Sequence, residues 1–156
     1  MTVVEEIAAI PRSSNEAAVE LVSRLDAEQW RRLTFAAGWP VGVTARHVVL
    51  GHRQFVGWVR GMVDSGVVDP GDIDALNARQ AAAGIVADPD DVVRLLQDEG
   101  EAAVRAVTAL TPGDVEGELD SGGRRMPRIA LLGASVRHVE SHLASIRAAV
   151  DAGDAT

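Results

Sequence analysis

The chain has 156 residues, a length that suits one domain, and 47% of them are hydrophobic, which is enough to fill a core. Only 3% are aromatic, so Ala, Val, Leu and Ile must build that core, and this composition favours packed helices over a sandwich or barrel. The net charge of -8 argues against nucleic acid and against an anionic membrane surface as partners.

Several residue types that carry chemistry are missing. Without Cys or Tyr, the chain has no disulfides, thiolate ligands or phenolic acid, and without Lys it has no Schiff base or Walker-type phosphate loop. No apolar run reaches the roughly 20 residues of a spanning helix. Glu5 and Glu6 stand where a signal peptide would carry positive charge, so we expect a cytoplasmic protein. Arg in place of Lys, with abundant Ala and Gly, suggests a GC-rich bacterial genome.

The first half of the chain predicts two long helices. The first covers residues 2–25 and is expected to be interrupted near Pro11, with a Ser capping the restart. A linker follows and ends in the turn formed by residues 38–40. The second helix begins near Val41 and runs to about residue 63, where glycines and a Pro end its apolar pattern.

The second half predicts one short and two long helices. The short helix spans residues 72–83, and Asp88 followed by Pro89 looks like the start of a long helix that runs to residue 110. Residues 113–125 are polar and Gly-rich and predict a loop or a short hairpin. The last helix covers residues 127–150. Together these segments predict one all-α domain over residues 1–156, an antiparallel four-helix bundle with a short extra helix between the second and third helices.

Four histidines lie on only two of these helices. His138 and His142 are four residues apart, so both side chains lie on one face and can reach one metal ion. His47, on the apolar face of the second helix, is the best third ligand. His52 is about 140° further around that helix and is not expected to share the site. The spacing alone is also compatible with a coincidental or pH-sensitive pair and a core His47.

Three motifs add weight to the metal interpretation. The segment GWPVGVTARHVVLGH places His47 eight residues after Trp39, and the segment SVRHVESHLASI carries His138 and His142. They resemble the two signatures of the DinB-like superfamily. The intervening segment DIDALNARQAAAGIVADPDDVVRLL is similar to its mycothiol-dependent maleylpyruvate isomerase branch, which carries a related Asp-x-x-Asn stretch.

The resemblance implies a DinB-like bundle in which three His hold one divalent metal, with zinc the first choice and nickel the second. A three-His site leaves a coordination position open, as catalytic zinc requires. The family suggests that a small thiol enters there, mycothiol first, or bacillithiol or glutathione. The expected activity is S-transfer to, or isomerisation of, a small electrophile. The alternatives are a non-catalytic metal-containing small-molecule-binding protein and a metal-dependent hydrolase, and a homodimer is possible.

A thiol or substrate pocket is expected beside the metal. Its candidate residues come from three helices: Gly51, Gln54, Phe55, Trp58, Asn77, Arg79, Ser135 and Ser141. Gly51 would let a ligand or another helix approach closely. Phe55 and Trp58 can equally be ordinary core, and Arg79 can be a solvated side chain. Glu140 is two residues from both His of the pair and is expected to point away from the metal.

Overall fold

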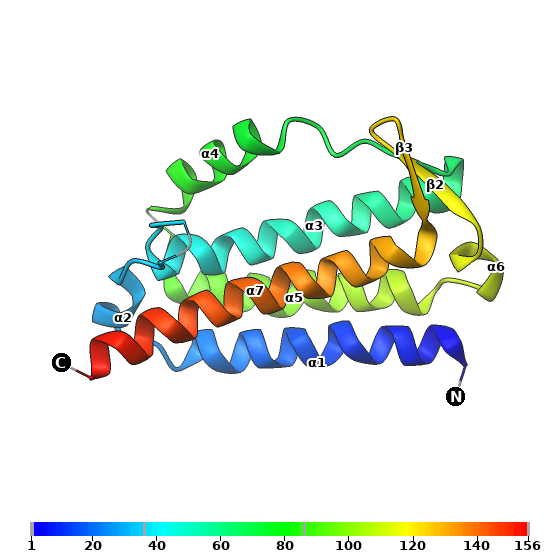
Figure 1. Cartoon of the computed structure of the whole chain (residues 1–156). Helices are drawn as coiled ribbons and strands as arrows, with labels where there is room; N and C mark the ends of the chain where they lie inside the picture. Colours follow the sequence, from blue (N-terminus) through cyan, green and yellow to red (C-terminus); the bar gives the residue numbers. More distant parts are fainter. Residues whose placement is uncertain (1, 36, 86, 156) are drawn as a thin grey trace.

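The computed structural model describes residues 2–35, 37–85 and 87–155. Most of these residues are helical, so the predicted all-α class and the extra helix between the second and third long helices are confirmed. In chain order the elements are α1 Val3–Ser23, α2 Ala27–Arg31, α3 Val41–Ser65, β1 Val67–Val68, α4 Ile73–Gly84, α5 Pro89–Thr108, α6 Pro112–Val115, β2 Glu118–Ser121, β3 Arg124–Pro127 and α7 Arg128–Asp154 (Figure 1). None of the described helices is long and apolar enough to cross a membrane.

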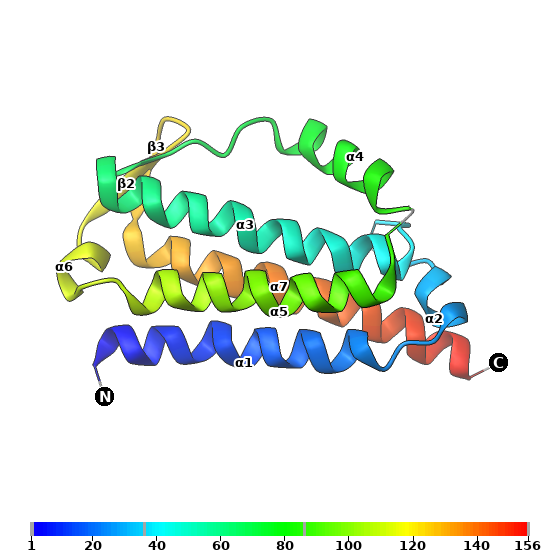
Figure 2. The same cartoon turned by 180° about the vertical axis from the view of Figure 1, so that it is seen from behind.

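The helices α1, α3, α5 and α7 form the predicted four-helix bundle. Both α5 and α7 pack against α1 and against α3. Figures 1 and 2 show that α1 and α7 run in one direction and that α3 and α5 run in the other. The pairs α1–α5 and α3–α7 are therefore antiparallel, as expected, whereas α3 and α5 are parallel. The reason is α4, which carries the chain back along the outside of α3 before α5 begins.

Short polar side chains cap the starts of several helices, among them α1, α4 and α5. Asp88 caps α5, since its Oδ1 accepts hydrogen bonds from the backbone N–H of Asp90 at 2.9 Å and of Asp91 at 3.2 Å, with Pro89 in the first turn. The cap predicted from the sequence is thus confirmed.

The expected interruption near Pro11 is wrong: α1 continues through Pro11. A proline costs a helix one hydrogen bond, and the packing of α1 on two neighbouring helices outweighs that cost.

The segment between α5 and α7 contains the hairpin that was one of its two predicted forms. Strands β2 and β3 pair antiparallel, and Gly122 and Gly123 form the turn between them with φ of 59° and 85°. Both values lie in the left-handed region, which glycine adopts without strain. β1 adds to β2 in parallel, with Val67 opposite Asp120. The short helices α2 and α6 and the strand β1 had no clear sequence signal.

A polar layer divides the bundle core in two. One hydrophobic cluster contains Val4, Phe55, Val107 and Leu131, and the other contains Val22, Val48, Leu96 and Leu143. Between the two sets of positions each long helix carries a small or polar residue; these residues are Asn15, His52, Gly100 and Ser135. We call them the central polar layer. The buried Oδ1 of Asn15 and both ring nitrogens of the buried His52 have no hydrogen-bond partner among the described residues.

Gly100 permits the close approach of α1 and α5 in this layer. A Cβ at Gly100 would overlap the side chain of Asn15, which is only 7% exposed and has little room to move. By contrast, a Cβ at Gly57 in α3 would meet no atom within 4 Å, and Gly57 is exposed. The two glycines therefore offer a matched pair of positions for the same substitution.

We expect Gly100→Ala to lower the free energy of unfolding by about 1–3 kcal/mol, because Asn15 or α1 must shift. Gly57→Ala should raise it by about 0.5–1 kcal/mol through the helix propensity of Ala. Urea unfolding followed by circular dichroism measures both. In an Asn15→Ala background the cost of Gly100→Ala should shrink. An unchanged cost there would show that the two residues do not determine the helix separation.

The burial of His52 leads to a second prediction, about how the free energy of unfolding depends on pH. Burial lowers its pKa to about 4, with the charge of Glu99 acting in the opposite direction. Its pKa in the unfolded chain is about 6.5, so between these two values the unfolded chain binds a proton that the folded chain does not. The free energy of unfolding therefore falls as the pH drops through this window.

In His52→Leu this contribution is absent, and Leu needs no hydrogen-bond partner. We compare the fall in the free energy of unfolding between pH 7.5 and about pH 5 in the two metal-free proteins. This fall should be about 2 kcal/mol smaller in His52→Leu than in the parent chain. Urea titrations at the two pH values measure the difference. Equal pH dependence in both proteins would contradict the buried, neutral His52.

Candidate metal centre

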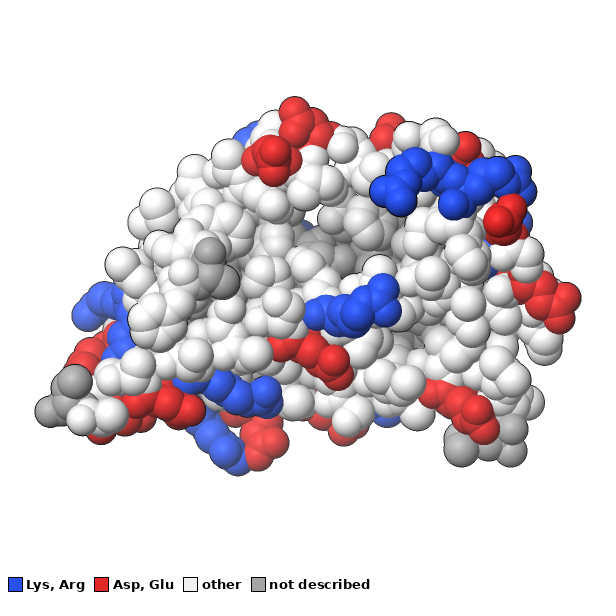
Figure 3. Space-filling view, in the orientation of Figure 1, with Lys and Arg blue, Asp and Glu red and all other residues white. Residues whose placement is uncertain are grey.

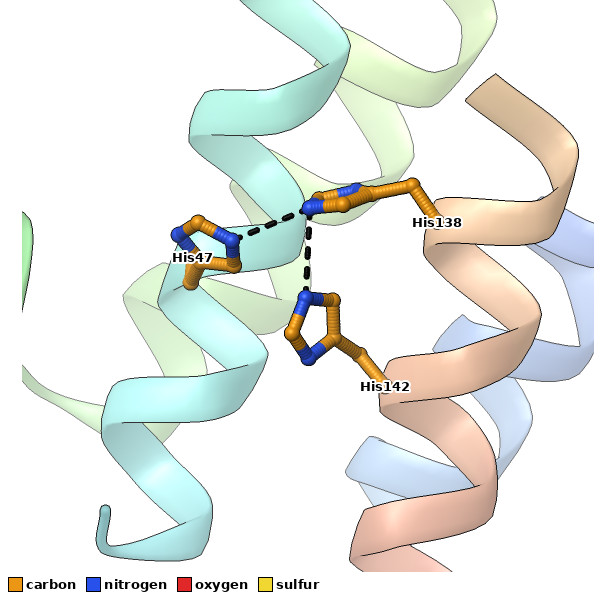
Figure 4. A group of neighbouring side chains, drawn as sticks. All are labelled: His47, His138 and His142. Carbon is orange, nitrogen blue, oxygen red and sulfur yellow. Dashed lines mark hydrogen bonds between the residues drawn. The ribbon is translucent and has the colours of Figure 1, made fainter. Parts of the chain in front are cut away.

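Three histidine rings converge between α3 and α7. His47 comes from α3, and His138 and His142 come from successive turns of α7 (Figure 4). The Nε2 atom of His138 lies 3.0 Å from Nε2 of His47 and 3.2 Å from Nε2 of His142. Each ring offers one nitrogen, and these nitrogens all lie within 4.8 Å of one another. The structure therefore brings together the three residues that the sequence analysis selected as ligands.

Two neighbours fix the positions of these rings. Gly51 stands one turn after His47, and a Cβ there would lie 2.9 Å from Cε1 and 3.1 Å from Nδ1 of His138. The missing Cβ thus leaves room for the His138 ring against α3. Trp39 contacts His47 edge to face, with ring centroids 5.3 Å apart. Its backbone oxygen accepts a hydrogen bond of 2.8 Å from the N–H of Thr34, which anchors the loop before α3. Trp39 and His47, eight residues apart in the sequence, are therefore in direct contact at the site.

Gln80 is a site residue that the sequence analysis missed. Its Oε1 lies 2.6 Å from Nδ1 of His47, on the side of the ring away from the other histidines. Gln80 belongs to α4, in the segment that was expected to approach the pocket through Asn77 and Arg79. Asn77 is half-buried and Arg79 is exposed. The sequence offered one signal for Gln80: it lies three residues after Asn77, so both side chains fall on one helix face.

The three rings are held in the neutral form that metal ligands need. Burial lowers the pKa of His47, and the hydrogen bond to Gln80 acts in the opposite direction. Burial first, and then the neighbouring His142, His47 and His52, lower the pKa of His138 to about 3. Burial and His47 lower the pKa of His142 to about 4. The three imidazoles that face one another are therefore neutral at neutral pH. Each has one ring nitrogen that carries no proton, and this nitrogen can bind a metal ion.

The predicted pocket residues on α3 divide into two groups. Gly51 adjoins His138, as described above, and Gln54 is half-buried one turn further along. Phe55 is 3% exposed and belongs to one of the two hydrophobic clusters, and Trp58 packs against the same cluster. These two aromatic residues therefore have the packing of ordinary core.

The predicted residues on α7 also differ in burial. Ser135 is half-buried and lies in the central polar layer, whereas Ser141 is exposed. Glu140 is exposed as well, and it is not part of the group of possible metal ligands. His52 is likewise outside that group. Among the described residues no carboxylate joins the three histidines.

The donor set fits a divalent metal ion. Bonds of 2.0–2.1 Å to zinc in tetrahedral geometry separate neighbouring ligand nitrogens by about 3.3 Å, close to the two distances observed here. His47 is buried, but His138 and His142 are half-buried, so the group is open on one side. Figure 3 shows that the molecule, in the orientation of Figure 1, has a hollow in its surface between α4 and the β2–β3 hairpin. The three histidines could hold a metal ion with a position left for another ligand.

Comparison with known proteins identifies the family. Residues 12–146 match the sequence model of the DinB superfamily, so the chain belongs to that superfamily. The resemblance indicated by the sequence motifs is thereby confirmed. No protein with a curated description matches the chain.

Solved structures share the fold at low sequence identity. YfiT from Bacillus subtilis, described as a probable metal-dependent hydrolase with an unusual four-helix bundle topology, superposes with a TM-score of 0.83 at 16% identity, over 99% of this chain and 90% of YfiT. The mycothiol-dependent maleylpyruvate isomerase gives a TM-score of 0.75 at 17% identity, over 93% of this chain. The aligned part is 61% of that isomerase, so this chain corresponds to about three fifths of it. A DinB-like protein from Bacillus subtilis gives 0.69 at 16% identity, covering 97% of this chain and 93% of that one.

The glycine beside His138 makes the site testable without removing a ligand. In Gly51→Ala the new Cβ pushes on the His138 ring, and metal sites tolerate ligand displacements of only about 0.2 Å. We expect zinc affinity to fall about 10-fold or more, measured by competition with a chromogenic chelator. Gly57→Ala makes the same change further along α3 and should leave the affinity unaltered. An equal affinity of Gly51→Ala and the parent chain would show that His138 does not bind zinc in this position.

Proposed function

We propose that this protein is a metal-dependent enzyme in which His47, His138 and His142 hold one divalent ion, zinc in the first place and nickel as the alternative. The convergence of three neutral imidazole nitrogens, with no fourth protein ligand among the described residues, carries this proposal. Structural zinc sites are usually closed by four protein ligands, whereas catalytic sites keep one position open. The fold shared with a protein described as a probable metal-dependent hydrolase supports the same proposal.

The cosubstrate we propose is a low-molecular-weight thiol, with mycothiol as the first choice. A divalent ion lowers the pKa of a thiol bound to it, so the thiol reacts as thiolate at neutral pH. The thiolate sulfur would form a bond to an electrophilic carbon of a small substrate, either by displacing a leaving group with its bonding electrons or by adding to an activated double bond, whose displaced electron pair then takes a proton from solvent. The product is either an S-conjugate or, when the thiol leaves again, an isomer. The fold shared with a mycothiol-dependent isomerase supports this proposal.

Hydrolysis is the second candidate, because YfiT is described as a probable metal-dependent hydrolase and shares the fold over nearly the whole chain. In that reaction a divalent ion would lower the pKa of a bound water to about 7, and hydroxide would take the place of the thiolate. Among the described residues no carboxylate joins the three histidines, so no carboxylate ligand distinguishes the two nucleophiles. The two candidates differ in one observable: only the thiol reaction depends on added thiol.

The metal test uses protein purified without a histidine tag. We expect about one equivalent of zinc or nickel per chain by mass spectrometry of the metals, and less than about a tenth of an equivalent in His142→Ala. His52→Leu serves as the matched control, since His52 is a histidine outside the group, and it should keep its metal. Equal metal contents in the parent chain and His142→Ala would contradict the three-histidine site.

The thiol test uses zinc-loaded protein, monochlorobimane as the electrophile, and mycothiol, bacillithiol or glutathione. We expect faster conjugation with at least one thiol, and loss of that acceleration in His142→Ala. A nitrophenyl ester without thiol tests hydrolysis in parallel. Ester cleavage without any thiol-dependent reaction would favour the hydrolase. Full metal content with neither activity would favour a protein that binds a small molecule without turnover.

A further inference from the structure

The contact between Gln80 and His47 constrains where the imidazole proton lies. An amide oxygen has no proton to donate, so at 2.6 Å from Oε1 of Gln80 the Nδ1 atom of His47 must be the donor. A neutral imidazole carries one proton. With that proton on Nδ1, Nε2 of His47 presents a lone pair towards His138, whose Nε2 lies 3.0 Å away.

The packing of α4 on α3 brings Gln80 to this position. One turn after Gln80, Gly84 is buried, and a Cβ there would lie 3.3 Å from the Cα of Val43. Val43 in turn stands one turn before His47. The two helices thus run antiparallel and make two contacts one turn apart: a close backbone approach at Gly84 and the hydrogen bond at Gln80.

The rest of α4 contributes little to its own docking. In α4, whose residues are all described, only Gly84 is buried, and Ile73 at its start is 39% exposed. The side chain of Gln80 is half-buried, so its hydrogen bond to His47 is partly shielded from water. Because α4 is mostly exposed, core packing does not account for the hydrogen bond between Gln80 and His47.

From this geometry we infer that Gln80 is a positioning residue of the metal centre: it holds the proton of His47 on Nδ1 and turns Nε2 towards the site. The inference rests on the proposed metal binding by His47, His138 and His142. Histidines that bind metals commonly donate their second ring N–H to a carboxylate or carbonyl oxygen, which orients the ring and raises its basicity. Here α4 supplies that acceptor, so the extra helix is part of the site.

Three substitutions separate this role from a general effect on α4. Gln80→Leu removes the acceptor, and Gln80→Glu keeps an acceptor oxygen at the same place. Ala82→Leu puts the same leucine at an exposed position of the same helix and is the matched control. The melting temperatures of the metal-free variants show whether each one folds like the parent chain.

The first measurement is the tautomer of His47 in metal-free protein, by nitrogen-15 NMR of the imidazole ring. We expect the proton on Nδ1 in the parent chain, in Gln80→Glu and in Ala82→Leu, and a mixture of tautomers in Gln80→Leu. The second measurement is zinc affinity by chelator competition. We expect about 10–100-fold weaker binding in Gln80→Leu, restored affinity in Gln80→Glu and parental affinity in Ala82→Leu.

Two results would overturn the inference. One is a proton on Nε2 of His47 in the parent chain. The other is unchanged zinc affinity in a folded Gln80→Leu variant while the parent chain binds zinc. If the parent chain binds no zinc, the proposed metal site itself fails, and the NMR measurement still decides whether Gln80 sets the tautomer. If Gln80→Leu does not fold, failure of Gln80→Glu to match the parental affinity and tautomer counts against the inference.

Discussion

Three imidazole rings share a half-buried space between α3 and α7, and this constraint shapes the structure around them. Charged imidazolium groups would repel one another at these distances, so the rings must be neutral, and burial lowers the pKa of each one accordingly. Three ring nitrogens that face one another cannot all be paired by the protons they carry. A divalent cation would satisfy all of them at once, and Gly51, Trp39 and Gln80 lie against the rings that would hold it.

The bundle topology brings these rings together. His47 and the pair on α7 meet because α3 and α7 are antiparallel neighbours. The chain then returns along α3 as α4, which brings Gln80 to the site and leaves α5 parallel to α3. The central polar layer crosses the bundle in the middle of its length, where His52 and Asn15 leave buried atoms without partners. Such atoms destabilise a core, so an apolar side chain of similar size at His52 or Asn15 would remove an unsatisfied polar group.

Local signals in the sequence predicted the long helices and the shared helix face of His138 and His142. The four-residue spacing of His138 and His142 and the cap at Asp88 depend on neighbours in the chain, and both are found as expected. Interactions between distant segments could not be read in this way. The parallel direction of α5 depends on how α4 packs, and the contact of Gln80 with His47 joins two helices across 33 positions. The sequence predicts a break at Pro11 because it does not show the packing that keeps α1 intact.

X-ray absorption spectroscopy of the zinc-loaded protein tests the central claim most directly, since it counts the imidazoles around the metal. We expect three imidazole nitrogens at about 2.0–2.1 Å and one further oxygen or sulfur ligand that exchanges with added thiol or water. The His142→Ala protein should show one imidazole fewer or no bound zinc. A fourth imidazole from His52, or a shell with fewer than three imidazoles in the parent chain, would contradict it.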